Sequence, residues 1–243
     1  MKLYVDAGNT RLKWCLEEAG ETVASGAGAL DGESPLAGIA GFASRIRRIA
    51  VSTVASEENR ERLLGYLAGL SNVPARCYWS EPERAGLQNA YSDYHRMGAD
   101  RWHAMYGAWL GHKQGFVVVD AGSAVTVDFV DQCGRHLGGY ILPGLQMMFR
   151  SLKTDAARIG FDPGQVWATG PGKSTGECVN HGLAWLSDAM IVRILQDAQV
   201  FGLADILVTG GDADRLIGLG LCGIHRPDLV LAGLRAIADE EAS

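Results

Sequence analysis

The stretch Val5-Asp6-Ala7-Gly8-Asn9-Thr10 decides the fold, because its first four residues return later as Val119-Asp120-Ala121-Gly122. Each copy follows an apolar run that suits a buried strand. These runs are Leu3-Tyr4-Val5 and Phe116-Val117-Val118-Val119. Such self-similarity indicates that the chain consists of two related halves.

The two stretches share a chemistry that suits phosphate binding. A strand delivers an aspartate to its carboxyl end, and the glycine that follows lets the backbone approach a phosphate without a Cβ in the way. Asp-Ala-Gly-Asn is also good turn chemistry, so the first copy alone fits an ordinary hairpin equally well. Two copies, separated by the length of one small domain, favour a pair of phosphate-binding turns.

Length and composition agree with two globular lobes. A chain of 243 residues exceeds one average domain and falls short of three. Hydrophobic residues make up 47% of the chain and charged residues 21%, as in a globular protein with an ample core. Strands alternate with helices along the sequence. We therefore expect two α/β lobes with mixed sheets, an N-terminal lobe of residues 1–113 and a C-terminal lobe of residues 114–243.

Charge and apolar length exclude several classes of protein. The formal net charge of -6 argues against a nucleic-acid partner, because Lys and Arg are not in excess. No segment approaches the apolar length that spans a bilayer, and a strand begins at the N-terminus, so we expect no membrane contact, no signal peptide and a cytoplasmic location.

The five cysteines form no Cys-x-x-Cys pair. They therefore predict neither a disulfide framework nor a zinc site, and we expect reduced thiols in the core or at its boundary. They are Cys15, Cys77, Cys133, Cys178 and Cys222.

Lys13 is the first candidate for a charged phosphate ligand. Leu12, Trp14 and Leu16 alternate with polar residues, which predicts a half-buried strand that pairs back on the first one. Lys13 then projects from the polar face near the turn. It could be a solvated surface lysine, but its place just after Asn9-Thr10 favours a phosphate contact.

Asp100 is the candidate general base. It stands at the start of a predicted helix whose inner face carries Trp102, Met105, Tyr106 and Trp109, a stripe that we interpret as core. An acid in the first turn is also favoured by the helix dipole, so helix capping is an equally good reading of Asp100 on this evidence alone. Residues 89–97 before it predict a loop.

The second half repeats the pattern imperfectly. When Asp6 is placed on Asp120 without a gap, Lys13 falls on Val127, so the apolar phase is out by one residue and the lysine has no counterpart. The run Gly170-Pro171-Gly172-Lys173-Ser174 imitates a Walker phosphate loop, but Trp167 stands where that motif requires glycine.

The rest of the second half predicts further regular elements. A long helix follows Thr175 and should turn Leu183, Leu186 and Met190 inward. The strand Ile206-Leu207-Val208 then ends in a third glycine turn at residues 209–213, and a final helix starts near Pro227.

Taken together, these motifs make the chain resemble the type III pantothenate kinases, which belong to the superfamily of acetate kinases, sugar kinases and actin-like ATPases. The resemblance spans nearly the whole length. It rests on the order and spacing of several motifs. They are Asp6-Ala7-Gly8-Asn9-Thr10 with Lys13, Tyr91 with Gly98-Ala99-Asp100-Arg101, Asp120-Ala121-Gly122-Ser123-Ala124 with Thr126, Gly138-Gly139 with Ile141 and Pro143-Gly144, Thr175, and Gly210-Gly211.

The resemblance implies two actin-like (ribonuclease H-like) lobes with a nucleotide cleft between them. It also implies ATP-dependent phosphorylation of the primary hydroxyl of pantothenate to 4'-phosphopantothenate, the first step of coenzyme A biosynthesis, by a homodimer. Mg²⁺ and a monovalent cation, K⁺ or NH₄⁺, would assist.

Site residues are carried over from the family by position. Asp100 would be the base, Asp6 would lie near Mg²⁺, and Asp120 would bind the monovalent cation. The expected ATP-binding residues are Asp6, Ala7, Gly8, Asn9, Thr10, Arg11, Leu12, Lys13, Ser123, Gly210 and Gly211. The expected pantothenate-binding residues are Tyr91, Gly98, Ala99, Asp100, Arg101 and Thr175.

Two positions depart from the family pattern. Ser123 replaces the usual threonine and keeps its hydroxyl, whereas Tyr94 stands where a proline is usual and could reshape the acceptor pocket.

Two other functions stay open. A different small-molecule kinase or phosphoanhydride hydrolase would keep both turns, and a non-catalytic accessory protein could share the fold but would not need Asp6, Lys13, Asp100 and Asp120 together.

Overall fold

The computed structural model describes residues 1–32, 35–155 and 168–242. They form two compact units, one of Met1–Gly111 with Asp228–Ser243 and one of His112–Pro227. We expected residues 114–243 to form the second lobe. Instead, the last segment belongs with the first unit, because its helix α6 (Leu229–Glu240) packs on a helix and two strands of that unit.

The first unit is built on a mixed five-stranded sheet with the strand order β3-β2-β1-β4-β5. β1 pairs antiparallel with β2 and parallel with β4. The strands are β1 Lys2–Ala7, β2 Arg11–Glu18, β3 Glu21–Ala29, β4 Arg48–Thr53 and β5 Ala75–Tyr78, with a separate ribbon of β6 Glu83–Arg84 and β7 Leu87–Gln88. The helices are α1 Glu57–Leu70, α2 Ala99–Trp109 and α6, with short 3-10 helices at Ala40–Arg45 and Tyr94–Arg96.

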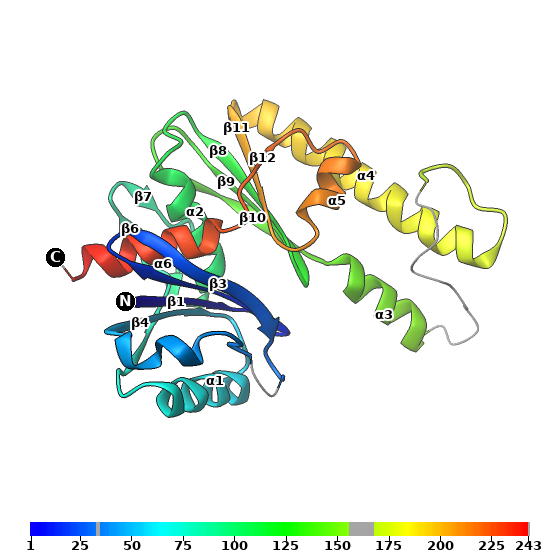
Figure 1. The fold of residues 1–243 in the computed structure, drawn as a ribbon. Coiled ribbons are helices and arrows are strands. Elements are labelled where there is room, and N and C mark those ends of the chain that lie inside the picture. The colour runs from blue at the N-terminus through cyan, green and yellow to red at the C-terminus, as the bar shows by residue number, and fades with distance from the viewer. Residues whose placement is uncertain (33–34, 156–167, 243) are drawn as a thin grey trace. The chain divides into compact units, whose positions relative to one another are not determined.

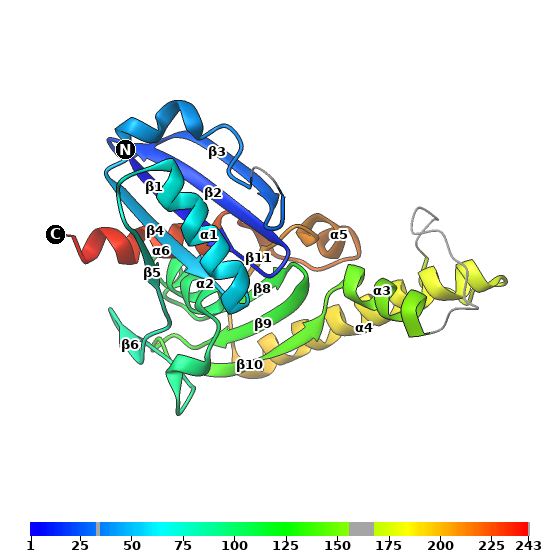
Figure 2. The ribbon, with the colours of Figure 1, turned by 90° about the horizontal axis from the view of Figure 1, so that it is seen from below.

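Helices cover both faces of this sheet (Figure 2). On one face, the predicted apolar alternation of β2 is confirmed, because Leu12, Trp14 and Leu16 are buried in one core with side chains of α1. Ser56 caps α1 by accepting a hydrogen bond from the Asn59 N–H. α2 and α6 pack on the other face, against β4 and β1.

α2 and α6 approach each other closely at two glycines. A Cβ on Gly107 of α2 would lie 2.7 Å from the Leu229 carbonyl oxygen of α6, and one on Gly233 would collide with the His103 carbonyl oxygen. Close packing of this kind buries the predicted stripe of α2, which includes Trp102 and Tyr106.

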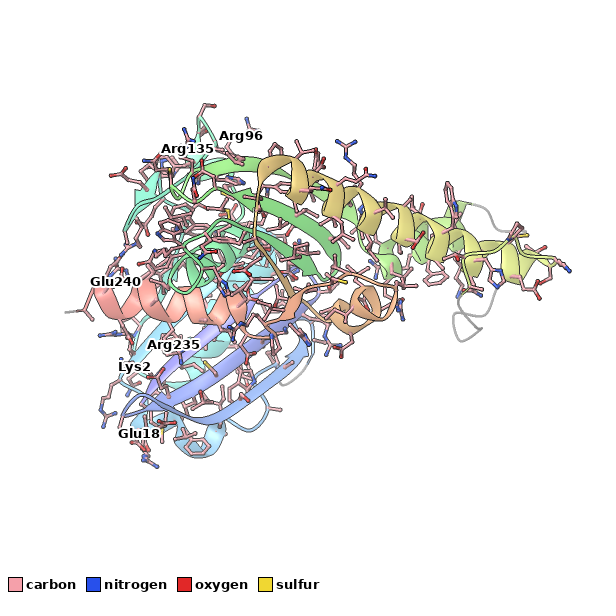
Figure 3. All side chains as sticks on the ribbon, turned by 90° about the horizontal axis from the view of Figure 1, so that it is seen from above. Lys2, Glu18, Arg96, Arg135, Arg235 and Glu240 are labelled. Carbon is pink, nitrogen blue, oxygen red and sulfur yellow. The ribbon has the colours of Figure 1, made fainter. Side chains whose placement is uncertain are left out.

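Ion pairs and hydrogen bonds fasten the C-terminal end of α6 to the first unit. Asp239 accepts hydrogen bonds from Lys2 Nζ at 2.7 Å, Tyr4 Oη at 3.0 Å and Arg48 at 3.1 Å. Glu240 accepts from Arg84 and Tyr106. Lys2 and Glu240 both lie at this end of α6 (Figure 3). This network gives the chain terminus a fixed place in the unit where the chain begins.

The second unit has a sheet of the same kind, with the order β10-β9-β8-β11-β12. The central strand β8 again pairs antiparallel with the next strand in the chain and parallel with the fourth. Its elements are β8 Phe116–Ala121, β9 Ala124–Val130, β10 His136–Pro143, α3 Leu145–Asp155, α4 Thr175–Phe201, β11 Asp205–Thr209, α5 Ala213–Gly218 and β12 Ile224–His225 (Figure 1). Counted along the chain, both sheets therefore have the order 3-2-1-4-5.

The long helix α4 has two partners. Its C-terminal half packs Ile191 and Ile194 into the core of the second sheet, and its N-terminal half packs Leu183 against α3. α3 and this half of α4 lie side by side (Figure 1). Leu186, which we expected inside, is 47% exposed.

The thiols and the helices bear on two further expectations. All five cysteines are free, but Cys133, Cys178 and Cys222 are exposed rather than in the core or at its boundary. None of the helices in the described ranges is long and apolar enough to cross a membrane.

Candidate functional site

The first Asp-Ala-Gly stretch forms the turn between β1 and β2. The Gly8 N–H donates to the Arg11 carbonyl oxygen at 2.9 Å and closes a loop in which Asn9, Thr10 and Arg11 are exposed. The loop is held from outside by the Leu30 N–H, which donates to the Thr10 carbonyl oxygen. Asn9, Thr10 and Arg11 are therefore the exposed polar residues of this turn.

Asp6 and Lys13 lie opposite each other on the two strands that lead into this turn. Both side chains are partly exposed. Ala7 and Leu12, also expected to bind ATP, have 0% and 1% exposure, so only their backbone atoms could serve a ligand. A carboxylate and an ammonium therefore stand together at the end of the first sheet.

The second turn is one residue shorter, and this corrects the alignment made from sequence. The Gly122 N–H bonds to the carbonyl oxygen of Ala124, so Ala124 takes the place that Arg11 takes in the first turn. As a result Asp120 lies opposite Thr126. Lys13 thus has a counterpart, Thr126, and the apparent phase error came from a gapless comparison.

Three glycine-containing segments of the second unit meet at Asp120. Gly210 has a φ of +94°, and a Cβ there would lie 2.5 Å from Asp120 Oδ1. The Asp212 N–H donates to the Ala121 carbonyl oxygen at 2.8 Å, and the Gly144 N–H donates to the Ser123 carbonyl oxygen at 3.1 Å. These glycines lie far apart in the sequence, and the structure brings them to one edge of the sheet.

The first turn of α2 carries the predicted acceptor motif. Gly98 is the N-cap and makes no side-chain capping bond, so Asp100 is not the capping residue. Asp100 Oδ1 accepts from the Arg101 N–H at 2.8 Å, and a Cβ on Gly98 would lie 2.6 Å from the same oxygen. Glycine at position 98 therefore makes room for the Asp100 carboxylate, while Ala99 beside it is buried.

Arg101 joins this motif to Tyr91. Its guanidinium donates to Tyr91 Oη at 2.9 Å and lies 5.7 Å from the centre of the Tyr91 ring. Arg101 is 5% exposed, so an internal charge stands next to the Asp100 turn. Tyr94, the departure from the family pattern, lies in the short 3-10 helix between them and stacks on His95.

Thr175 is the first residue of α4 and is exposed. Ser174 caps this helix by accepting from the Glu177 N–H, so the Walker-like run ends in an ordinary helix cap, as its missing glycine indicated. Residues 156–167, which precede this run, lie outside the described residues.

An apolar pocket in the second unit was not foreseen from sequence. Its lining includes Ala121 and Pro143 beside the second turn, Leu186 and Met190 of α4, and Asp212 and Arg215 near the third glycine turn. This pocket explains why Leu186 can be exposed. Its residues come from six separate elements, β8, β9, β10, α3, α4 and α5 with its N-cap, and no local pattern brings them together.

No cluster of three or more His, Cys, Asp or Glu side chains in the described part of the chain could hold a metal ion by itself. The strongest perturbation of a histidine lies at His103, where burial, with a smaller effect of Arg84, lowers the pKa to about 3. His103 lies on α2 and bonds Ser52 of β4 through Nδ1 at 2.8 Å. It is therefore a neutral, internal group at neutral pH.

Two sheets of the same strand order, each with an Asp-Ala-Gly turn at the end of its central strand, define the actin-like class of α/β folds. Solved structures support this class. The chain resembles a protein assigned as a 2-dehydro-3-deoxygalactonokinase from Sinorhizobium meliloti, with a TM-score of 0.59, 13% identity and 99% of both chains covered. It also resembles component A of (R)-2-hydroxyglutaryl-CoA dehydratase from Acidaminococcus fermentans, with a TM-score of 0.55, 16% identity, and 99% of this chain and 98% of that chain covered.

Sequence comparison identifies the family within this class. The family model for type III pantothenate kinases matches residues 2–197. A type III pantothenate kinase from Marinobacter nauticus is 57% identical over 238 residues, which cover 98% of each chain. The chain belongs to the type III pantothenate kinase family.

Proposed function

We propose that this protein transfers the γ-phosphoryl group of ATP to the primary hydroxyl of pantothenate, giving 4'-phosphopantothenate and ADP in the first step of coenzyme A biosynthesis. The observation that carries this proposal is the family match together with the 57% identity to a relative of that name. The geometry adds a carboxylate, Asp100, at a glycine-capped helix start beside a buried arginine.

ATP binding is assigned to the glycine turns. In the first unit, the backbone of residues 7–12 and the side chains of Asn9, Thr10 and Arg11 would face the phosphates, with Lys13 neutralising their charge. In the second unit, Ser123, Gly210 and Gly211 would contact the nucleotide. Glycine suits these places because a backbone without Cβ can approach a phosphate closely.

Mg²⁺ would accompany ATP and neutralise the charge that develops on the phosphates. In kinases it is held by one or two carboxylates together with substrate phosphates. Asp6 supplies one carboxylate of that kind at the partly exposed end of β1. The donor set therefore fits a metal that arrives with the nucleotide.

Pantothenate binding is assigned to the start of α2. Arg101 carries the charge that a substrate carboxylate requires, Tyr91 holds Arg101 by a hydrogen bond, and Gly98, Ala99 and Thr175 complete the set. Asp100 would accept the proton of the substrate hydroxyl as its oxygen attacks the γ-phosphorus. The bond from that phosphorus to the bridging oxygen then breaks, and ADP leaves.

A monovalent cation is assigned to Asp120. A carboxylate near ATP phosphates suffers like-charge repulsion, and an intervening K⁺ or NH₄⁺ would turn that repulsion into attraction. The residue in the register place of Lys13 is here the neutral Thr126, so this unit brings no ammonium of its own to that position.

A second copy of the chain is assigned as the macromolecular partner. The family resemblance implies a homodimer, and the second unit exposes large apolar side chains that an interface would bury, among them Tyr140, Ile141 and Trp185. α2 has few side chains left for an interface, since most are already buried. Sedimentation at micromolar concentration tests this, and a monomer there would rule the dimer out.

One assay tests the proposed function against its alternatives. ATP-dependent phosphorylation should be measured with pantothenate, with other small alcohols and carboxylates, and without any acceptor. We expect turnover with pantothenate only. Preference for another acceptor would indicate a different small-molecule kinase, release of phosphate without acceptor would indicate a phosphoanhydride hydrolase, and no turnover at all would indicate an accessory protein.

A further inference from the structure

Ser52 and His103 form a buried hydrogen bond within the first unit that the proposed reaction does not use. Ser52 lies near the carboxyl end of β4, His103 lies on α2, and both residues are 0% exposed. Ser52 Oγ and His103 Nδ1 are 2.8 Å apart. The bond therefore ties α2 to the end of the strand next to β1.

This bond lies between the positions of two proposed site carboxylates. In the parallel pairing of β1 with β4, Ser52 is the register partner of Asp6, and register partners on neighbouring strands point to the same face of a sheet. His103 lies three residues after Asp100, which places both on one side of the helix. The bond thus joins the Asp6 position of the sheet to the Asp100 side of α2.

A second contact holds the start of α2 on the same strand ends. A Cβ on Gly98 would lie 3.3 Å from Val54 Cγ1, so the helix start packs directly on the residue that follows β4. The Val54 N–H in turn donates to the Ala7 carbonyl oxygen at 3.1 Å. The packing of Gly98 on Val54 and the hydrogen bond between Ser52 and His103 therefore set the place of α2 along β4.

If packing were the only role of this residue, histidine would be less favourable for stability than an apolar side chain. In the part of the chain that the structure describes, His103 Nε2 is buried without a hydrogen-bond partner. A buried polar atom without a partner destabilises the fold, and an apolar side chain of similar shape would avoid that loss. Because burial keeps the imidazole neutral, His103 is not a proton carrier at neutral pH. What it offers is a directional bond that stays the same over the working pH range.

We propose that Ser52 and His103 are positioning residues for Asp100, whose carboxylate they hold in place by fixing the rotation of α2 on β4. This inference rests on the proposed role of Asp100 as the base. A misplacement of about 1 Å can cost about 100-fold in rate. Loss of the bond should therefore lower kcat and leave the KM for ATP unchanged.

The test compares two hydrogen bonds of the same helix, the buried one between Ser52 and His103 and the partly buried one between Tyr106 and Glu240. Ser52→Ala removes the bond from α2 to β4, and Tyr106→Phe removes the bond from α2 to Glu240 of α6. We expect Ser52→Ala to lower kcat by about 10- to 100-fold. Tyr106→Phe should lose thermal stability with kcat unchanged. His103→Asn places an amide where Nδ1 lies and should keep much more of kcat than His103→Leu. If Ser52→Ala does not fold, the comparison of these two His103 variants tests the proposal instead.

A double variant separates this inference from the function on which it rests. If Ser52 acts through Asp100, adding Ser52→Ala to Asp100→Asn lowers the residual rate no further. A clear further loss in the double variant, or wild-type kcat in Ser52→Ala, would overturn the positioning role while the base assignment stands. Wild-type turnover in Asp100→Asn alone would overturn the base assignment, and the positioning role with it.

Discussion

Thr126 lies opposite Asp120 across β9 and β8, at the register position that Lys13 occupies opposite Asp6 in the other unit. The repeated turns therefore carry the same acid but differ in its cross-strand neighbour, an ammonium in one unit and a hydroxyl in the other. A cation bound at Asp120 would supply in the second unit the charge that Lys13 supplies in the first.

This relationship leads to a prediction for Thr126→Lys. The new ammonium would stand in the register place of Lys13, so we expect stimulation by K⁺ to fall strongly while activity in Na⁺ buffer rises. Thr126→Val, which adds no charge, should keep the salt response. The measurement is kcat in matched potassium and sodium buffers. An unchanged potassium response in a folded Thr126→Lys protein would argue against the cation assignment.

Asp100→Asn tests the base. The amide keeps the shape of the side chain and can still accept from the Arg101 N–H, but it cannot take the substrate proton. We expect kcat to fall by about 10²- to 10⁴-fold, the usual contribution of a general base. ATP affinity, measured by calorimetry, should stay near the wild-type value. Near wild-type kcat would mean that Asp100 serves the helix start only.

Gly210→Ala and Gly211→Ala form a matched pair for the third glycine turn. At position 210 the backbone has a φ of +94° and an added Cβ would meet Asp120 Oδ1 and the Ala121 backbone, whereas at position 211 it would meet nothing within 4 Å. Backbone strain alone should cost Gly210→Ala about 1–3 kcal/mol, with the collision in addition. Urea unfolding should show a clear loss for Gly210→Ala and little for Gly211→Ala. Equal losses would contradict this account of the turn.

The lowered pKa of His103 predicts that the free energy of unfolding falls in acid. Its pKa is about 3 in the folded chain, mainly because of burial, and near the ordinary value of 6.5 in the unfolded chain. The unfolded chain therefore binds one more proton between these values, so the stability that the neutral ring supports above pH 6.5 is lost as the pH falls towards 3. The loss should be about 1.4 kcal/mol per pH unit in that window. His103→Asn should lack this component in urea unfolding at several pH values, and an identical pH slope in both proteins would refute it.

Much of the local structure around the candidate site could be predicted from sequence because its signals are local. An aspartate after a buried strand, a glycine in the next turn and an acid in the first turn of an amphipathic helix each need only a few neighbouring residues. The same holds for the alternation of Leu12, Trp14 and Leu16, which the structure confirms.

Relationships that depend on distant segments were missed or misread. A turn shorter by one residue moved Thr126 into the place of Lys13, because strand register depends on turn length and not on sequence similarity alone. The approach of Gly210 and Gly144 to the Asp120 turn joins three separate segments. Leu186 looked like core by its helical spacing and proved half exposed beside a pocket.

The sequence by itself determined the two strand-turn units, the acids at their ends and the helix that presents Asp100, since hydrophobic periodicity and glycine geometry act within a few residues. Only the tertiary structure decided that α6 returns to the first unit, where Asp239 and Glu240 meet Lys2, Tyr4, Arg48 and Arg84. It also decided that His103 meets Ser52. Pairings over such separations arise from packing the whole chain, because many partners would satisfy each residue locally and only one arrangement satisfies all of them together.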